Sequence, residues 1–246
     1  MTPAPSRLFD AVERTWPAAA THRAGPWLIR DGQGGGKRVS AATAAAPVTE
    51  ADIAQAEDAM RALHQAPLFM IRAGDEALDA LLDARGYTIV DPVRVLVMPV
   101  AGLTDKPVPP VTAFAIREPL AIMAEIWAEG GIGPARLDVM ARAENRTGIL
   151  VRWNEKPAGT GFVACDGDIA MVHAVEVKPA QRRQGVAGWI MRAAAFWAQD
   201  QGARTMAVLC TEANTAANAL YSALGFERAG HYHYRMTSAT GAKDYG

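Results

Sequence analysis

A short segment ahead of an apolar run combines the residue types of an anion-binding loop. It reads EVKPAQRRQGVAG and spans Glu176 to Gly188 of the 246-residue chain. If a helix begins here, successive backbone N–H groups between Arg183 and Gly188 point at one place, and the positive end of the helix dipole adds to them. Small residues let phosphate oxygens approach the backbone, and Arg182 and Arg183 add positive charge.

The ligand that this segment predicts is a diphosphate. It lacks the Lys-Ser/Thr pair of a nucleoside triphosphate loop and has no metal-binding aspartate nearby. A second glycine cluster, DGQGGGKR, also departs from the triphosphate pattern, because Asp31 occupies its first glycine position and Arg38 replaces its Ser/Thr. We interpret this second cluster as a flexible hairpin loop.

Metal chemistry is not indicated. Cys165 and Cys210 are the only cysteines, too few for a disulfide framework or a structural zinc site. His231 and His233 share a face of a predicted strand, but no carboxylate or cysteine stands at a convincing spacing from them. We therefore predict no metal site.

Composition excludes several classes of function. The chain has 25 basic and 26 acidic residues, a net charge of −1, which does not suit a non-specific nucleic-acid binder. Half of the residues are hydrophobic, as in a folded globular protein. The sequence shows no secretory signal and no apolar run that would span a bilayer. We expect a cytoplasmic protein without a membrane or nucleic-acid partner, and its oligomeric state stays open.

Proline marks a boundary inside the chain. Residues 104–112 hold three prolines between two apolar runs, which favours an extended connection. We predict a linker here, between a domain of residues 1–103 and a domain of residues 113–246. In the second domain we expect a strand, a helical region from Pro119 to Ala143 broken at EGGIGP, two hairpins, and then helix, strand, helix and two strands. The first domain should include the strand-like runs PWLIRDG and KRVSAAT.

The two halves share a pattern. Positions 80–87 read Ala-Leu-x-x-Ala-x-Gly-Tyr and positions 219–226 read Ala-Leu-x-x-Ala-x-Gly-Phe. A strand is expected before and after each copy, so we infer an internal repeat. The copies differ at one informative position, since Tyr221 of the second corresponds to Leu82 of the first.

The opening segment resembles the central motif of the GNAT acetyltransferase superfamily. That motif, Arg/Gln-x-x-Gly-x-Gly/Ala after a strand ending in Val-x-Pro, is matched by Arg182, Gly185 and Ala187. The segment NTAANALYSALGFERAG resembles the second conserved block of the family, with Asn214 and Tyr221 in place. The resemblance implies an α+β fold of two tandem GNAT-like domains, each a mixed, mostly antiparallel sheet flanked by helices. The first half lacks the motif, so it would be a degenerate copy that serves as a scaffold or as one wall of the acceptor site.

The resemblance also implies acetyl-CoA as the acyl donor and assigns roles to residues. Backbone groups of Val175 and Val177 would pair with the pantetheine arm where two strands splay apart. Asn214 would contact the cofactor further along, and Tyr221 would protonate the departing thiolate. The pyrophosphate would lie on the loop residues Arg182, Arg183, Gln184, Gly185, Val186, Ala187 and Gly188.

Two residues are candidates for the general base that takes a proton from the acceptor amine. His173 stands where some members of the family carry their base, and an ordinary histidine titrates at about 6.5. Glu176 is the rival, although strand alternation places it on the face opposite Val175 and Val177.

These features predict an N-acetyltransferase that moves an acetyl group from acetyl-CoA to a primary amine by direct transfer in a ternary complex. The alternative is a non-catalytic acyl-CoA-binding or regulatory module on the same fold. The acceptor is left open between small amines, amino acids and peptide N-termini.

Overall fold

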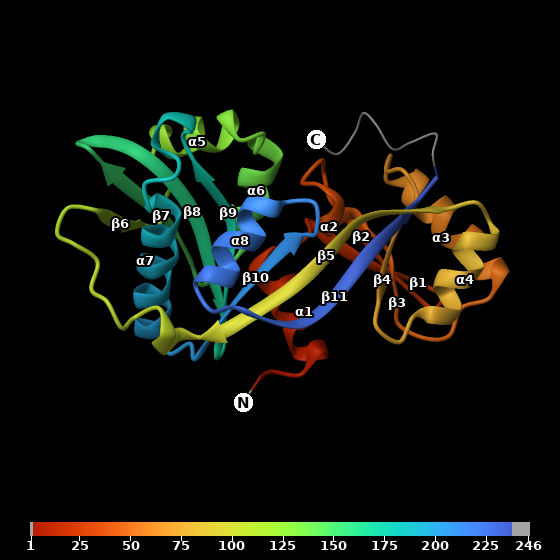
Figure 1. Cartoon of the computed structure of the whole chain (residues 1–246). Helices are drawn as coiled ribbons and strands as arrows, with labels where there is room; N and C mark the ends of the chain where they lie inside the picture. Colours follow the sequence, from red (N-terminus) through yellow and green to blue (C-terminus); the bar gives the residue numbers. More distant parts are fainter. Residues whose placement is uncertain (1, 238–246) are drawn as a thin grey trace. The chain divides into compact units, whose positions relative to one another are not determined.

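The computed structural model describes residues 2–237, and these form two compact units (Figure 1). The first unit gathers Val95–Cys210, Asn214–Ala229 and the N-terminal segment through Pro17. The second holds Ala18–Arg94, Thr211–Ala213 and, within the described residues, the segment 230–237. Because the units interleave along the sequence, the domain limits 1–103 and 113–246, with a linker at 104–112, stay a prediction.

The sheet of the first unit is mixed. It begins with three antiparallel connections, from β6 (Ala113–Ile116) through β7 (Arg146–Trp153) and β8 (Lys156–Asp166) to β9 (Ile169–Val177). The next strand, β10 (Thr205–Thr211), runs parallel to β9. The expected hairpins are therefore present, and the α+β class with a mixed sheet is confirmed.

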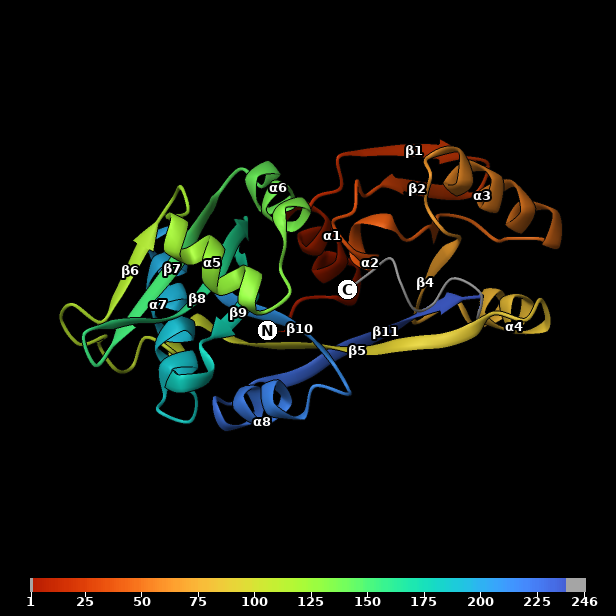
Figure 2. The ribbon, with the colours of Figure 1, turned by 90° about the horizontal axis from the view of Figure 1, so that it is seen from above.

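Helices cover both faces of this sheet (Figures 1 and 2). On one face α7 (Val186–Asp200) and α8 (Thr215–Ala223) contribute to the main apolar core. On the other face α1 (Pro5–Thr15) and α5 (Ala121–Glu129) pack against β8 and β9. The predicted break at EGGIGP is confirmed, since α5 ends at the first residue of this segment, Glu129, and α6 (Pro134–Arg142) begins at its last. No helix within residues 2–237 is long and apolar enough to cross a membrane.

Glycines of β8 let α7 approach the sheet closely. A Cβ on Gly161 would lie 2.6 Å from a side-chain carbon of Ile190, and one on Gly159 would lie 3.0 Å from a side-chain carbon of Val186. Any side chain at these two positions would push the helix outward. The beginning of α7 is thus held against β8 by packing, which fixes the place of the loop that precedes it.

The second unit has a small sheet of its own. Strands β1 (Ala20–Ala24), β2 (Trp27–Asp31) and β3 (Thr43–Ala44) form an antiparallel sheet. The prediction of a strand over KRVSAAT is wrong for most of its length, because Lys37–Ser40 forms the short helix α2; strand β3 begins only at Thr43, after an isolated bridge from Ala42 to Phe69. Its remaining elements before residue 88 are α3 (Glu50–Ala62), β4 (Leu68–Arg72) and α4 (Glu76–Ala84).

Two long strands contribute to both units. The strand β5 covers Thr88–Pro99 and β11 covers Glu227–Met236, so the two strands expected near the C-terminus are one. The strand order β4-β11-β5-β10 places the end of β5 beside β10 in the first unit. In the second unit the end of β11 pairs antiparallel with β4, from Tyr232 opposite Arg72 to Met236 opposite Leu68. Each unit therefore contains a paired strand segment that comes from the other half of the sequence.

A buried carboxylate stabilises the second unit. The Glu57 side chain accepts hydrogen bonds from Arg85 Nε at 2.9 Å and from the Tyr87 hydroxyl at 3.0 Å. Burial alone would raise the pKa of Glu57, but the hydrogen bonds from Arg85, Tyr87 and Arg61 together lower it. A lowered pKa in the folded state means that the ionised group favours folding above the pKa of the unfolded chain, and that this contribution is lost as the pH falls.

We therefore expect Glu57→Ala to lower the free energy of unfolding by about 2 kcal/mol at neutral pH, because the Tyr87 hydroxyl loses its buried acceptor. The difference from the unsubstituted protein should shrink as the pH falls below about 4. Urea unfolding across this pH range measures both effects. Asp58→Ala is the control: this exposed carboxylate also contacts Arg61, at 3.0 Å, and its loss should cost less than about 0.5 kcal/mol. Equal losses for the two variants would contradict the assignment.

Candidate functional site

The two parallel strands of the first unit separate at one end. The register of β9 and β10 ends at the pair Val172 and Val208, although β9 continues to Val177 and β10 to Thr211 within the described part of the chain. This opens the β10 side of β9 from Ala174 onward. Val175 and Val177, where the sequence predicts that the strands splay apart, lie in the part of β9 that does not pair with β10. An extended ligand could pair with this open edge as an added strand.

A β-bulge lies at the same place. Thr160 pairs with Glu176 and Phe162 pairs with His173, so β9 has one residue more than β8 across this interval. Ala174 takes the left-handed conformation, with φ 51°. The extra residue changes the alternation of side chains, and it brings His173 and Glu176 to the same face of the sheet. Val175 lies on the other face, where it packs against the core around α7.

The loop after β9 leads directly into the N-terminus of α7. It contains the short helix η2 (Pro179–Gln181), and Arg183 and Gly185 have φ values of 62° and 81°. No side chain caps α7, and its first turn holds no acidic residue. A Cβ on Gly185 or Gly188 would meet nothing within 4 Å. The first N–H groups of a 15-residue helix thus face an uncrowded place that suits an anion.

Three polar contacts hold the loop. Arg182 Nε donates to the Val177 carbonyl at 3.1 Å, and Gln184 Nε2 donates to the Ala180 carbonyl at 3.2 Å. The Gln184 amide oxygen accepts from Asn154 at 3.3 Å. Arg182 is therefore tied to the end of β9, while Arg183 is exposed. The predicted phosphate residues 182–188 form one continuous turn, and their cofactor role stays a prediction.

Glu176 lies half-buried beside the C-terminal end of α5. A Cβ on Gly130 would lie 2.4 Å from the Glu176 carboxyl carbon. Burial raises the pKa of Glu176, an effect that the charges of Arg182 and Arg136 partly offset. A carboxylate with a raised pKa is a better proton acceptor than an ordinary surface glutamate.

His173, the other candidate base, is enclosed on the α1 side of the sheet. Only 5% of it is exposed, and its Nε2 lies 3.1 Å from the Thr15 hydroxyl oxygen. Its ring packs against Trp16 at a centroid distance of 4.9 Å and against Phe162 at 6.2 Å. These contacts describe a histidine of the core. Its predicted role as a base stays untested by the geometry.

Tyr221 lies on α8 with 6% of its surface exposed. Its ring packs edge-on against Phe226, at 5.5 Å between centroids. Burial raises the pKa of Tyr221, and the charges that Cys210 and Glu176 carry when ionised raise it further. The hydroxyl is therefore protonated at neutral pH, the form that an acid requires.

Asn214 begins α8. Its amide oxygen accepts from Ala217 N at 3.0 Å, which makes it the N-cap of this helix. The predicted contact of Asn214 with the cofactor would use polar groups of this residue other than the amide oxygen that caps the helix. Among residues 2–237 no group of His, Cys, Asp or Glu could hold a metal ion. His233, one of the two histidines considered as metal ligands from the sequence, lies in the second unit, with its Nε2 2.9 Å from an Asp79 carboxylate oxygen.

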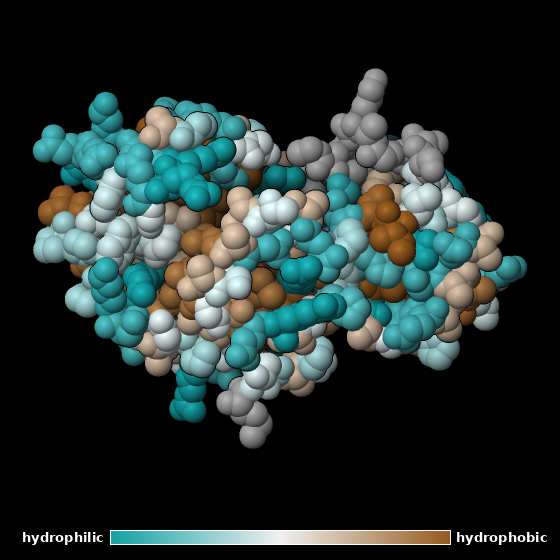
Figure 3. Space-filling model, in the orientation of Figure 1, coloured by the Kyte–Doolittle hydropathy of each residue, from teal (hydrophilic) through white to brown (hydrophobic). Residues whose placement is uncertain are grey.

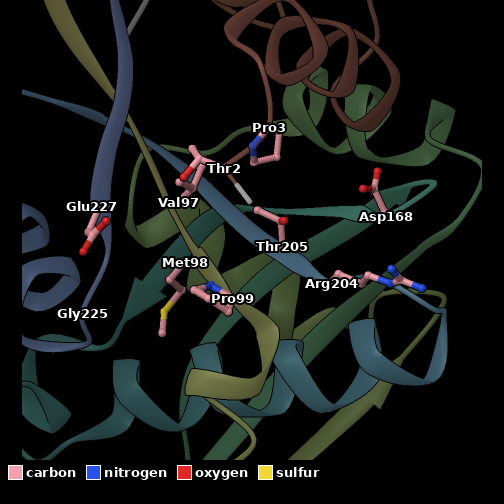
Figure 4. A pocket seen from close by; sticks show the side chains of 10 residues that line it. All are labelled: Thr2, Pro3, Val97, Met98, Pro99, Asp168, Arg204, Thr205, Gly225 and Glu227. Carbon is pink, nitrogen blue, oxygen red and sulfur yellow. The ribbon is translucent and has the colours of Figure 1, made fainter.

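A cavity of about 520 Å³ lies elsewhere in the first unit (Figure 4). It is near the beginning of β10, the end at which β9 and β10 still pair. None of the predicted site residues lines it. In contrast, the surface between α7 and α8 exposes apolar side chains on the face seen in Figure 3. The lining of the cavity comprises Thr2, Pro3, Val97, Met98, Pro99, Asp168, Arg204, Thr205, Gly225 and Glu227.

Sequence reasoning missed two residues that contact the bulged part of β9. Trp127 is fully buried, and its indole Nε1 donates to the Ala174 carbonyl at 2.8 Å. Gly130 accommodates Glu176, as described above. In the sequence they read as a core residue of an apolar helix and as part of a helix-breaking pair, so no local signal connects them with the site.

A strand opened at its end, a turn of small residues and an uncapped helix together form a place whose shape and charge suit an extended, diphosphate-bearing ligand. Residues 118–226 match the model of the acetyltransferase (GNAT) family. Residues 118–226 therefore correspond to the acetyltransferase domain that this family model describes. No curated protein matches the sequence.

Solved structures show the same fold over most or all of the chain. A GCN5-related N-acetyltransferase from Kribbella flavida matches with a TM-score of 0.74 and 18% identity, covering 100% of both chains. A putative GNAT acetyltransferase from Novosphingobium aromaticivorans gives 0.57 and 18%, covering 93% of this chain and 97% of that one. A tandem GNAT protein of the clavulanic acid biosynthesis pathway gives 0.57 and 16%, covering 79% and 74%. The predicted GNAT resemblance is confirmed, and the N-terminal half is compatible with a tandem arrangement.

Proposed function

We propose that the protein is an N-acetyltransferase that moves an acetyl group from acetyl-CoA to a primary amine by direct transfer in a ternary complex. One observation carries this proposal. The strands β9 and β10 stop pairing at Val172 and Val208, just before the uncapped N-terminus of α7 and the half-buried Glu176. A binding edge, an anion site and a titratable group thus belong to the same end of one sheet.

The binding role falls to backbone groups. Val175 and Val177 would offer theirs to the pantetheine arm, although the Val177 carbonyl already accepts from Arg182. The N–H groups at the beginning of α7 would bind the diphosphate, with Arg183 exposed beside them. No magnesium is needed, because the helix N-terminus and the arginines supply the positive charge.

The chemistry would use two side chains with opposite duties. The acceptor nitrogen attacks the thioester carbon, and Glu176 takes the proton that this nitrogen gives up. The C–S bond then breaks, and Tyr221 gives a proton to the departing sulfur, so an amide and a free thiol are formed. The raised pKa values of both groups support this division, because Glu176 becomes a stronger base and Tyr221 stays protonated.

Glu176 is favoured over His173 as the base. His173 is occupied by Thr15, Trp16 and Phe162 on the α1 side. Glu176 instead lies where β9 is open and carries a perturbed pKa, a combination that is frequent at functional sites. We therefore assign His173 a packing role.

The proposal is tested by thiol release from acetyl-CoA with a panel of small amines, amino acids and peptides. We expect one class of amine to accelerate thiol release and to yield the N-acetyl product by mass spectrometry. Binding of acetyl-CoA without turnover for any class would favour the non-catalytic alternative. No binding of acetyl-CoA at all would contradict both.

Replacing Tyr221 by phenylalanine is expected to lower kcat about tenfold, while KM for acetyl-CoA stays within about twofold. The effect is moderate because a thiol has a pKa of about 8.5, so its thiolate leaves with modest help. Steady-state kinetics with the best amine measures both constants. Tyr232→Phe, another buried tyrosine, is the matched control and should keep full kcat. Full kcat in Tyr221→Phe would remove the hydroxyl from the mechanism.

A further inference from the structure

The C-terminal end of α5 contacts β9 at two places: within the β-bulge, at Ala174, and at the Glu176 side chain that follows it. Trp127 and Gly130 are separated by less than one turn of chain, and they contact β9 in different ways. The Trp127 indole donates to the Ala174 carbonyl at 2.8 Å, within the bulge. Gly130 lies against the Glu176 side chain itself. The same end of α5 therefore contacts both the bulged backbone, which sets the direction of the Glu176 side chain, and the Glu176 carboxylate itself.

The Trp127 contact does more than fill space. A buried indole N–H needs an acceptor, and the carbonyl of a bulged residue is displaced from the regular ladder, so each group satisfies the other. Trp127 is 0% exposed, so water cannot replace it at this carbonyl. The bulge decides on which face Glu176 lies, and Trp127 holds the bulge.

Position 130 needs a glycine because a Cβ there would collide with the Glu176 side chain, and not because of the backbone conformation at this position. Its φ of −87° and ψ of 7° suit any residue. A Cβ there would lie 2.4, 2.6 and 2.8 Å from the carboxyl carbon, one carboxylate oxygen and the Cγ of Glu176. Its neighbour Gly131 differs, because its φ of 79° favours glycine while a Cβ would meet nothing within 4 Å. Glycine is thus favoured at position 130 by the space that Glu176 occupies, and at position 131 by the backbone conformation.

We propose that Trp127 and Gly130 are positioning residues that fix the direction and the half-buried setting of the Glu176 carboxylate. This rests on the proposed function for its catalytic consequence only. The charged and titratable groups that act on Glu176 are Arg136 on α6, Arg182 before α7 and Tyr221 on α8. Neither substitution removes any of these three groups, and Arg136 donates to the Gly131 carbonyl at 3.3 Å, so a changed Glu176 pKa reports a changed position of the carboxylate relative to them.

The test compares matched pairs of variants. Gly130→Ala forces the flexible end of Glu176 to move while the backbone stays in an allowed conformation. Gly133→Ala is its control, since a Cβ there meets nothing within 4 Å and φ is −84°. Trp127→Phe removes the N–H and keeps an aromatic ring. Trp27→Phe is its control, because Trp27 is also fully buried and also donates to a backbone carbonyl at 2.8 Å, in the second unit.

Two readouts separate positioning from catalysis. The pKa of Glu176 is measured by carbon NMR on protein with labelled glutamate carboxyls, with Glu176→Gln identifying the resonance. Steady-state kinetics across pH gives kcat and KM for acetyl-CoA. In Gly130→Ala we expect the Glu176 pKa to fall toward the ordinary glutamate value, because the carboxylate moves to solvent. We also expect kcat to fall about tenfold or more at unchanged KM, in both Gly130→Ala and Trp127→Phe.

Every outcome is decisive. An unchanged Glu176 pKa in Gly130→Ala, with unchanged kcat in both test variants, would overturn the proposal. Equal effects in the controls would also overturn it, since they would indicate general loosening of the fold. A lowered pKa with unchanged kcat would support positioning and contradict Glu176 as the base. Melting temperatures are recorded for all four variants, and Gly130→Ala keeps the test valid if Trp127→Phe unfolds.

Discussion

Glu176→Gln is expected to lower kcat about 100- to 1,000-fold, the range for loss of a general acid or base. The amide keeps the shape of the side chain and its packing beside Gly130, but it cannot take a proton from the acceptor amine. KM for acetyl-CoA should change little, because the proposed cofactor contacts come from the backbone of β9 and from the loop before α7. The result therefore isolates proton transfer from binding.

The pH dependence sharpens this first prediction. A base must be ionised to act, so kcat/KM of the unsubstituted protein should rise with pH through the pKa of Glu176. Burial raises that pKa, which moves the rise above the ordinary glutamate range of about 4.3. In Glu176→Gln the rise should disappear.

Two further variants complete the comparison. Glu144→Gln, an exposed glutamate after α6, is the control for loss of one negative charge. His173→Asn tests the rival base: we expect a lower melting temperature, because Thr15 and two aromatic rings lose their partner, and an unchanged pH profile. A pH profile that changes in His173→Asn but not in Glu176→Gln would reverse the assignment.

The second large effect is expected from Gly185→Glu, which should weaken binding of acetyl-CoA by at least about 100-fold. Gly185 has φ 81°, a conformation that costs an L-residue about 1 kcal/mol or more. The new carboxylate would also stand at the N-terminus of α7, where it would occupy the N–H groups proposed for the diphosphate and repel its charge. Calorimetric titration with acetyl-CoA measures the change, and kcat at saturation should be largely kept.

The chain offers a matched control for this substitution. Gly202 follows the other end of α7, has φ 84°, and a Cβ there also meets nothing within 4 Å. Gly202→Glu therefore imposes similar backbone strain and the same charge away from the proposed diphosphate site. Acetyl-CoA affinity should be unchanged in Gly202→Glu. A similar loss in both variants would mean that strain in α7, and not the anion site, explains the effect.

Local sequence was sufficient for the elements that carry the proposed cofactor site. The helix α7 begins at Val186, directly after the glycine of the predicted motif, and Asn214 caps α8. Turns and caps depend on residues that are neighbours in the chain, so a pattern such as Asp166-Gly167 predicts its hairpin without knowledge of the rest. The same holds for the break at EGGIGP.

Errors arose where distant parts of the chain decide the structure. The run KRVSAAT has strand-like residues, yet Lys37–Ser40 is helical. The C-terminal strand β11 lies between β4 and β5, two strands from the first half of the sequence, and its end pairs with Leu68–Arg72. Proline content, on which the predicted linker at 104–112 rests, carries no information about this pairing, because strand pairing is specified by the surfaces that meet.

What the sequence by itself determined is the GNAT resemblance of the C-terminal part, the α+β class and the place of the turn that we propose binds the diphosphate, since these depend on short patterns. The tertiary structure decided which titratable side chain stands beside the open edge of β9. One extra residue of β9 opposite Gly161 places Glu176 on the same face as α5. There Trp127 donates to the bulged backbone, and Gly130 leaves room for the Glu176 side chain. Alternation along a strand predicts faces only while the register is regular, and a bulge is set by partners that lie far away in the sequence.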